Sequence, residues 1–419
     1  MHLRGRMNSR YRFVILGLSF LVVLINYFDR AVISYAVTPI SEDFGWGNTG
    51  FGLAMSMFAL GTVAANGFSG WLLDRRSVKR VWTISIFFWS VVMLLLGAVH
   101  VVGLFLLLRF LLGIGEGATF PAMNRSMVNW MRPEELSRAT SITLLGVPMA
   151  MLLGSPIFAT LITDIGWRWT FFALGVLGAA VGVAMVVWYR DATPSEPHVP
   201  DEADHPDDAE PDLIPTRELL RDPTLLATSW SFFAFGYVLF FAITWIPGYF
   251  EQTYDLDLTQ IGWFATLPWA LAIVLMLIAG WLSDRLMKRS GRIRIARVHI
   301  IWIAQLIAAL LFVPLLFDPS SGVAVVFLSL AIGFSMMPNS PYYAICNEVF
   351  ARSSGAATGI MVTFFSVSGI VSPLLTGWLS DIFGGFAAAF GALIAVVGSA
   401  VLGMVLFAHP DRSLALTDR

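Results

Sequence analysis

Residues 70–75 read GWLLDR and residues 280–285 read GWLSDR, so the same short motif occurs in both halves of the chain. Each copy ends the second long apolar segment of its half. A Ser-Pro dipeptide at 155–156 returns at 372–373, and each proline lies eight residues before an aspartate. Two matched motifs at corresponding places indicate that the chain is an internal duplication.

The composition excludes several classes of protein. The chain has 419 residues, of which 57% are hydrophobic and 13% charged, with a mean hydropathy of +0.75. Soluble domains are about a quarter charged, so neither a soluble fold nor disorder fits this chain. The net charge of -2 gives no basic surface for nucleic acid. The single cysteine, Cys346, excludes an internal disulfide framework and a cysteine-rich metal site.

The apolar segments predict an all-α membrane protein, because a spanning helix needs about 20 apolar residues. The alternation of a transmembrane β-barrel is not seen. Twelve spans in two six-helix bundles are predicted, and a parallel repeat of this kind is typical of two-bundle transporters. The predicted spans are 13–38, 50–73, 81–100, 103–130, 137–163, 168–189, 225–250, 260–284, 296–317, 322–349, 354–380 and 384–408.

Three segments divide the chain. We predict an N-terminal bundle over 1–189, a tether over 190–222 and a C-terminal bundle over 223–419. The tether is acidic and rich in proline, and it cannot bury enough surface to fold. Lys and Arg gather in the loops on one side, which places both termini and the tether in the cytoplasm. The first span carries Asp29 and Arg30 and lacks a cleavage site, so it is not interpreted as a signal peptide. We expect a multi-pass protein of the bacterial inner (plasma) membrane.

Four charges fall inside predicted spans: Asp29 and Arg30 in the first, and Arg109 and Glu116 in the fourth. A charge at the bilayer centre costs about 2.5–3.5 kcal/mol, so these side chains should face water and one another. Asp29 lies about 24 Å into the first span and Arg109 about 9 Å into the fourth from the other side, at a similar depth. The pair Gly113 and Gly117 permits close approach to a neighbouring helix.

These residue types predict a transport site. Arg30 and Arg109 are assigned to an anionic substrate, because a guanidinium fork matches a carboxylate and stays charged. Asp29 and Glu116 are assigned to proton coupling, because loss of an arginine partner or of water favours the protonated carboxyl. The alternative is a static salt-bridge network that locks the first and fourth spans together.

Further candidates are polar or aromatic side chains in the spans. The expected substrate-binding set also includes Asn26, Tyr27, Tyr237, Trp245, Asn339 and Ser366. For each of these, plain helix packing, an interface position or a passive kink is the alternative. The two loop motifs are assigned to gating through charges at helix ends, namely Asp74, Arg75, Arg80, Asp284 and Arg285. No metal or cofactor is expected besides the coupling proton.

The whole chain resembles the major facilitator superfamily. The carrying residues are GWLLDRRSVKR at 70–80, NYFDR at 26–30, RFLLGIGEGATFPA at 109–122 and WIPGYF at 245–250. The last three resemble the anion:cation symporter family, which includes hexuronate, galactonate, vesicular glutamate and sialic-acid carriers. The resemblance implies proton-coupled symport of a small organic anion into the cytoplasm by a monomer, with the lipid bilayer as its other partner and no nucleic acid.

This chain departs from the family pattern at several positions. Ser77 replaces a glycine of the loop motif, and Thr62, Asn66 and Ser366 stand where longer polar side chains are common. The seventh span has no arginine, unlike the vesicular glutamate branch. These departures leave open a smaller or less hydroxylated monocarboxylate in place of a sugar acid.

Other functions remain as alternatives. No HExxH pattern, paired metal ligands or P-loop occurs, so we do not expect an enzyme. A proton-coupled exporter of drugs or lipids would carry a glycine-rich fifth span, which residues 146–156 match only in part. A non-transporting sensor on the same scaffold would normally need a signalling domain, and the tether and tails are short for one.

Overall fold

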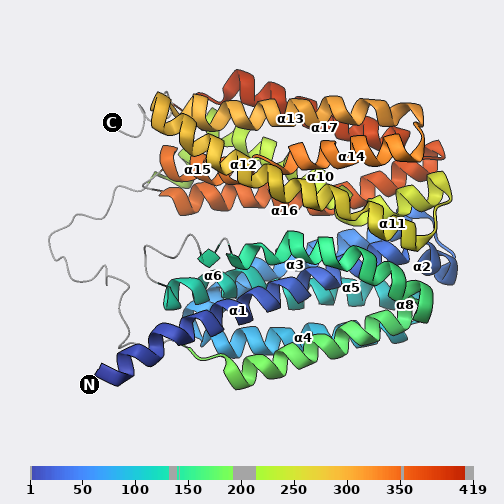
Figure 1. The fold of residues 1–419 in the computed structure, drawn as a ribbon, viewed down its shortest axis with the longest axis horizontal. Coiled ribbons are helices and arrows are strands. Elements are labelled where there is room, and N and C mark those ends of the chain that lie inside the picture. Colours follow the sequence, from blue (N-terminus) through green and yellow to red (C-terminus); the bar gives the residue numbers. More distant parts are fainter. Residues whose placement is uncertain (1, 132–138, 141, 192–213, 351–352, 411–419) are drawn as a thin grey trace. The chain divides into compact units, whose positions relative to one another are not determined.

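A computed structural model gives the fold and describes residues 2–131, 139–140, 142–191, 214–350 and 353–410 (Figure 1). These residues form helices and connecting turns, with no strand among them. Ten of their stretches are long and apolar enough to cross a membrane, and Ile142–Trp188 covers two predicted spans. Helix α3 (Asn48–Arg75) covers a further predicted span. The prediction of an all-α membrane protein is confirmed.

The chain divides into two compact units. Unit 1 comprises Met1–Trp46, Leu53–Asp204 and Asp257–Trp263, and unit 2 comprises Gly47–Gly52, His205–Leu256 and Phe264–Arg419. The predicted tether stays a prediction, because residues 192–213 of it lie outside the described residues. The loop cations Arg132 and Arg138 lie outside them as well.

Unit 1 holds the N-terminal helices. They are α1 (His2–Val32), the 3-10 turn η1 (Ile33–Ala36), α2 (Val37–Phe44), most of α3, α4 (Val78–Ala98), α5 (Val102–Glu116), α6 (Thr119–Trp130), α8 (Gly146–Trp188) and most of α11 (Leu258–Phe264). Helix α8 is interrupted at Gly166, whose φ of 78° favours glycine. This interruption separates the predicted fifth and sixth spans.

Unit 2 holds the C-terminal helices. They are α9 (Thr216–Leu219), α10 (Pro223–Tyr254), α12 (Thr266–Ser290), the π-helix η2 (Arg294–Val298), α13 (His299–Phe312), the 3-10 turn η3 (Val313–Phe317), α14 (Ser321–Met336), α15 (Asn339–Val349), α16 (Ser354–Phe383) and α17 (Ala387–Phe407). The Asp222 carboxylate accepts a hydrogen bond from the Leu225 amide at 2.8 Å, and Pro223 follows it. A capping aspartate followed by proline explains where α10 begins.

The fourth span of each half is broken at a corresponding place. In unit 1 the break separates α5 from α6, and in unit 2 it separates α14 from α15. Pro121 is the third residue of α6 and Pro341 is the third residue of α15. Proline is tolerated in a first helical turn, where its missing amide hydrogen costs little. The shared break extends the duplication seen in the sequence to the backbone.

Helices α3 and α5 of unit 1 approach each other through glycines. A Cβ atom on Gly113 would lie 2.0 Å from the Phe58 carbonyl oxygen, and one on Gly61 would lie 2.1 Å from the Phe110 carbonyl oxygen. A Cβ on Gly117 would lie 2.6 Å from the Ala65 Cβ. Small residues at such an interface let two backbones touch. The contact brings α3 against the face of α5 that carries the predicted site.

Candidate functional site

The four charges predicted inside the membrane are all buried in the structure. Asp29 is 1% exposed and Arg30 8%, while Arg109 and Glu116 are 0% exposed. Asp29 and Arg30 come from the last turns of α1, and Arg109 and Glu116 come from α5. None of the four lies on the lipid-facing surface, where each would carry the full cost of a charge in hydrocarbon.

Arg30 and Glu116 form an ion pair between α1 and α5. The Arg30 Nε donates to Glu116 Oε2 at 2.9 Å. The second Glu116 oxygen, Oε1, and the Arg30 Nη2 have no hydrogen-bond partner in the described part of the chain. The pair therefore keeps free hydrogen-bonding capacity on both sides.

Arg109 lies beside this pair, and among the described residues it has no acidic partner of its own. Its Nε donates to the Ala54 carbonyl at 3.4 Å, and its Nη2 contacts the Met55 sulfur at 3.3 Å. Within the described residues no carboxylate lies at ion-pair distance from Arg109, and its Nη1 has no hydrogen-bond partner. A buried cation without a counter-ion is costly, so this guanidinium is suited to receive an anion.

The aromatic ring of Phe58 joins the two arginines. The Arg30 guanidinium carbon lies 5.0 Å from the centre of this ring and that of Arg109 lies 4.8 Å from it. Tyr27 gives Arg30 a second ring at 4.7 Å. The negative faces of aromatic rings attract cations most strongly when water is excluded. Phe58 was missed by the sequence analysis, because an uncharged aromatic in an apolar span carries no distinguishing signal.

Asp29 and Asn26 complete the cluster on α1. The Asp29 carboxylate interacts electrostatically with Glu116, Arg109 and Arg30. Both Asp29 oxygens lack a hydrogen-bond donor among the described residues, and the Asn26 side-chain amide lies close to Glu116. Buried polar atoms normally have partners, so the unpartnered Asp29 oxygens require an explanation.

In unit 2 the predicted residues lie on α10, α15 and α16. Trp245 is fully buried and its Nε1 donates to the Pro373 carbonyl at 3.2 Å, so this group already holds α10 against α16. The Ser366 hydroxyl donates to Val362 of its own helix at 2.9 Å. Tyr237 is 1% exposed and its hydroxyl lacks a partner in the described residues. Asn339, the first residue of α15, is half-buried.

Two threonines near Tyr237 were missed by the sequence analysis. Thr244 on α10 and Thr376 on α16 are 0% exposed, and the Thr244 hydroxyl has no hydrogen-bond partner among the described residues. Thr376 lies close to the Tyr237 hydroxyl. Threonines in apolar spans usually bond to their own helix, so only the structure separates these two from the others.

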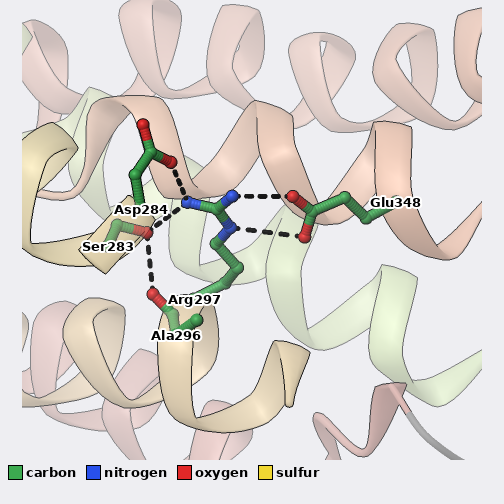
Figure 2. Close-up of polar contacts among 5 residues, drawn as sticks. All are labelled: Ser283, Asp284, Ala296, Arg297 and Glu348. Atoms are coloured by element: carbon green, nitrogen blue, oxygen red, sulfur yellow. Dashed lines mark hydrogen bonds and ion pairs between the residues drawn. The ribbon is translucent and has the colours of Figure 1, made fainter. Parts of the chain in front are cut away.

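The second loop motif belongs to a charge cluster on unit 2 (Figure 2). The Arg297 Nη1 bonds Asp284 Oδ1 at 3.0 Å, and its Nη2 bonds Glu348 Oε1 at 2.7 Å. Arg297 also donates to the Ser283 hydroxyl, which donates to the Ala296 carbonyl at 2.7 Å. The cluster links α12, η2 and α15. Arg297 and Glu348 were not singled out in the sequence, because each reads as an ordinary loop-side charge.

The other gating candidates have different surroundings. The Arg285 guanidinium lies 5.0 Å from the centre of the exposed Trp281 ring. Arg75 and Arg80 are exposed at the α3–α4 turn. The side chain of Asp74 lies outside the part that the structure describes. Among the described residues, no group of three or more His, Cys, Asp or Glu side chains could hold a metal ion.

Comparison with known proteins identifies the class of protein. The family model of the Major Facilitator Superfamily matches residues 19–373, and the chain belongs to this superfamily. Its members are transporters and not enzymes.

Three relatives match nearly the full length. The chain is 30% identical to the probable sulfoacetate transporter SauU of Cupriavidus necator, over 97% of this chain and 96% of that protein. It is 26% identical to the hexuronate transporter of Bacillus subtilis (96% of each chain) and 28% identical to the probable galactarate/D-glucarate transporter GudP of Escherichia coli (95% and 94%). The resemblance stated from the sequence is confirmed.

Two solved structures share the fold. A bacterial homologue of the human lysosomal transporter Spinster, in an inward-facing and unoccupied conformation, has a TM-score of 0.81 at 18% identity, over 98% of each chain. The D-xylose-proton symporter has a TM-score of 0.73 at 14% identity, over 96% of this chain and 99% of that chain.

Proposed function

We propose that the protein is a secondary active transporter that brings a small organic anion into the cytoplasm together with protons. Two related bundles that alternate in exposing a shared site to each side are the usual device of this architecture. The three relatives are named as transporters of organic acids, which supports an anionic substrate.

The observation that carries the proposal is the Arg109 guanidinium. It is 0% exposed, and in the described residues it has no ion-pair partner. Leaving one charge of a buried pair uncompensated costs about 3–5 kcal/mol. A substrate carboxylate bound to the free Nη1 would supply the missing partner.

The net charge of the cluster explains how proton binding could be coupled to anion binding. Arg30 and Arg109 balance Asp29 and Glu116 when both carboxylates are ionised. Protonation of one carboxylate leaves one excess positive charge, which a monovalent anion neutralises, and protonation of both leaves two, which a dianion such as sulfoacetate neutralises. Proton and anion therefore favour each other's binding through Coulomb attraction. Protonation of Glu116 would in addition release Arg30 from its 2.9 Å ion pair and free its fork for the substrate.

The hydroxyls of Thr62 and Ser366 favour a short acid with few hydroxyl groups. Thr62 donates its hydroxyl hydrogen to the Phe58 carbonyl at 3.1 Å, and Ser366 donates to Val362. Both hydrogens are used within their own helices, so neither is free for a sugar hydroxyl. Sulfoacetate is the substrate in the name of the 30% identical relative, and it is a small acid without alcohol hydroxyl groups.

The test is uptake by purified protein in proteoliposomes. Sulfoacetate, a hexuronate and galactarate are supplied outside, with an inward proton gradient and then with a protonophore that abolishes it. We expect accumulation of one of these acids with the gradient and only equilibration without it. Equal accumulation with and without the proton gradient would contradict the proposed proton coupling. Transport driven outward by the same gradient would instead support the exporter.

A matched pair of variants tests the site. Arg109→Ala should abolish uptake, whereas Arg76→Gln, which removes an exposed cation from the α3–α4 turn, should preserve it. Equal uptake by both variants would overturn the site assignment while leaving the transport class intact.

A further inference from the structure

A cavity of about 300 Å³ opens on unit 1 where α4 begins and α8 ends. Its lining residues are Ser77, Lys79, Arg80, Thr83, Ile84 and Val186. The two helices run side by side here (Figure 1). The ring of Trp82 on α4 packs edge-on against Tyr189, at 6.0 Å between ring centres, which fixes the end of α8 beside the start of α4.

The cavity lies at the level where the membrane surface meets the hydrocarbon. Ile84 is 63% exposed and Val186 is 47% exposed, as expected for lipid-facing side chains. Trp188 follows two residues later and is 57% exposed, and exposed tryptophans gather at the membrane interface. The positive-inside rule assigns this end of the unit to the cytoplasmic side.

The polar end of the cavity carries unpaired cations. Among the described residues no carboxylate lies at ion-pair distance from the Lys79 or Arg80 side chains. Asp191 is the nearby acid, and it is occupied with the start of α4. Its Oδ1 accepts from the Lys79 backbone amide at 2.9 Å, and its Oδ2 accepts from the Ser77 hydroxyl. The helix N-terminus is thus already capped, and the two cationic side chains remain for an anion.

Apolar surface runs from the cations into the hydrocarbon region. On α4, Ile84, Phe88 and Val91 are exposed at helical spacing below Arg80, and on α8 Val183 continues from Val186. A ligand that fits all of this surface has a negative head and an apolar tail. A free anion would use only the polar end.

We propose that this cavity binds the headgroup of an anionic phospholipid of the cytoplasmic leaflet, with Lys79 and Arg80 contacting the phosphate and the acyl chains lying along Ile84 and Val186. Basic pockets between membrane helices on this side are suited to such headgroups. The site belongs to unit 1 alone and does not depend on the transported substrate.

Native mass spectrometry of the purified full-length protein tests the proposal. Palmitoyl-oleoyl phosphatidylglycerol is compared with phosphatidylcholine of the same acyl chains. We expect the wild type and Arg76→Gln to retain the anionic lipid and the double variant Lys79→Gln/Arg80→Gln to lose it. Each basic side chain near an anionic surface contributes about a fivefold change in affinity, so the double variant should bind roughly 25-fold more weakly. Equal retention of both lipids, or equal loss in Arg76→Gln, would overturn the proposal.

Two further measurements separate a lipid from a free phosphate and from misfolding. Glycerol 3-phosphate at millimolar concentration should not displace the lipid, and displacement would assign the site to a soluble anion instead. A phosphatidylglycerol with a photoreactive headgroup should label wild-type peptides from the start of α4 or the end of α8. Labelling spread evenly over other basic turns would contradict the assignment. Because this experiment uses the wild type, its result does not depend on whether the variants fold.

Discussion

The Arg30 guanidinium on α1 pairs with the Glu116 carboxylate on α5 at 2.9 Å, while Arg109, on the same helix as Glu116, has no acidic partner within the described residues. Arg109 and Glu116 are seven residues apart, about 10.5 Å along the axis, which is too far for a direct ion pair in one helix. Arg30 on α1 thus pairs with the Glu116 carboxylate, and Arg109 on α5 has no ion-pair partner among the described residues.

This arrangement makes Glu116 a residue whose charge controls Arg30. Glu116→Gln mimics the protonated carboxyl permanently, so we expect the variant to exchange substrate across the membrane but to lose accumulation driven by a proton gradient. Wild-type uptake should rise as the outside pH falls, and uptake by the variant should be nearly independent of pH. Counterflow and gradient-driven uptake in the same vesicles measure both properties. Full gradient-driven accumulation by Glu116→Gln would show that Glu116 does not carry the coupling proton.

Arg109 is expected to supply most of the attraction for the substrate. Truncation of a buried charge that pairs with a ligand costs about 2–5 kcal/mol, so Arg109→Ala should weaken binding at least about 30-fold. Arg109→Lys keeps the charge but not the planar fork and should bind with intermediate affinity. Isothermal titration with the transported acid gives the affinities, and Arg76→Gln is the control. Wild-type affinity in a folded Arg109→Ala protein would contradict the prediction.

The glycine contact between α3 and α5 should be sensitive to a single methyl group. In Gly113→Ala the new Cβ would lie 2.0 Å from the Phe58 carbonyl oxygen, so the helices must separate. Overpacking of this kind costs about 1–3 kcal/mol, and we expect a lower thermal midpoint in detergent. Gly103→Ala is a matched control on the same helix, because nothing lies within 4 Å of its added Cβ. Equal midpoints for the two variants would show that the contact is not tight.

The Arg297 cluster should stabilise one end of unit 2. Arg297→Gln removes ion pairs to Asp284 and Glu348 and should lower stability by roughly 1–3 kcal/mol, the cost of leaving partly buried polar partners unsatisfied. Arg285→Gln removes an exposed cation that lies over an exposed ring, and it should change the thermal midpoint little. A larger effect of Arg285→Gln than of Arg297→Gln on the thermal midpoint would contradict the prediction.

Much of the fold was predictable from hydropathy, because a membrane permits only a few backbone structures. Every predicted span coincides with helix in the described residues, and the Gly113 and Gly117 pair lies at a close helix contact, as its spacing indicates. The break before Thr119 was not predicted, because the hydropathy continues through it unchanged, whereas a kink at Asn339 was among the alternatives that the neighbouring prolines offered.

The charged members of the site were predictable and their partners were not. Charge inside an apolar span marks Arg30, Arg109 and Glu116 directly, whereas their pairing depends on how α1 and α5 rotate against each other. Phe58 and Thr376 resemble dozens of other apolar and hydroxyl residues in the chain. Only their contacts, or the absence of contacts among the described residues, distinguish them.

The direct backbone contact at Gly113 limits how this protein can be re-engineered. Two main chains touch there, because a Cβ on Gly113 would lie 2.0 Å from the Phe58 carbonyl oxygen. The position of Phe58 along α5 is therefore set by backbone contact and not by the choice of side chains. A directed-evolution library aimed at new acids should therefore leave positions 61 and 113 fixed and diversify Met55, whose side chain contacts the Arg109 guanidinium.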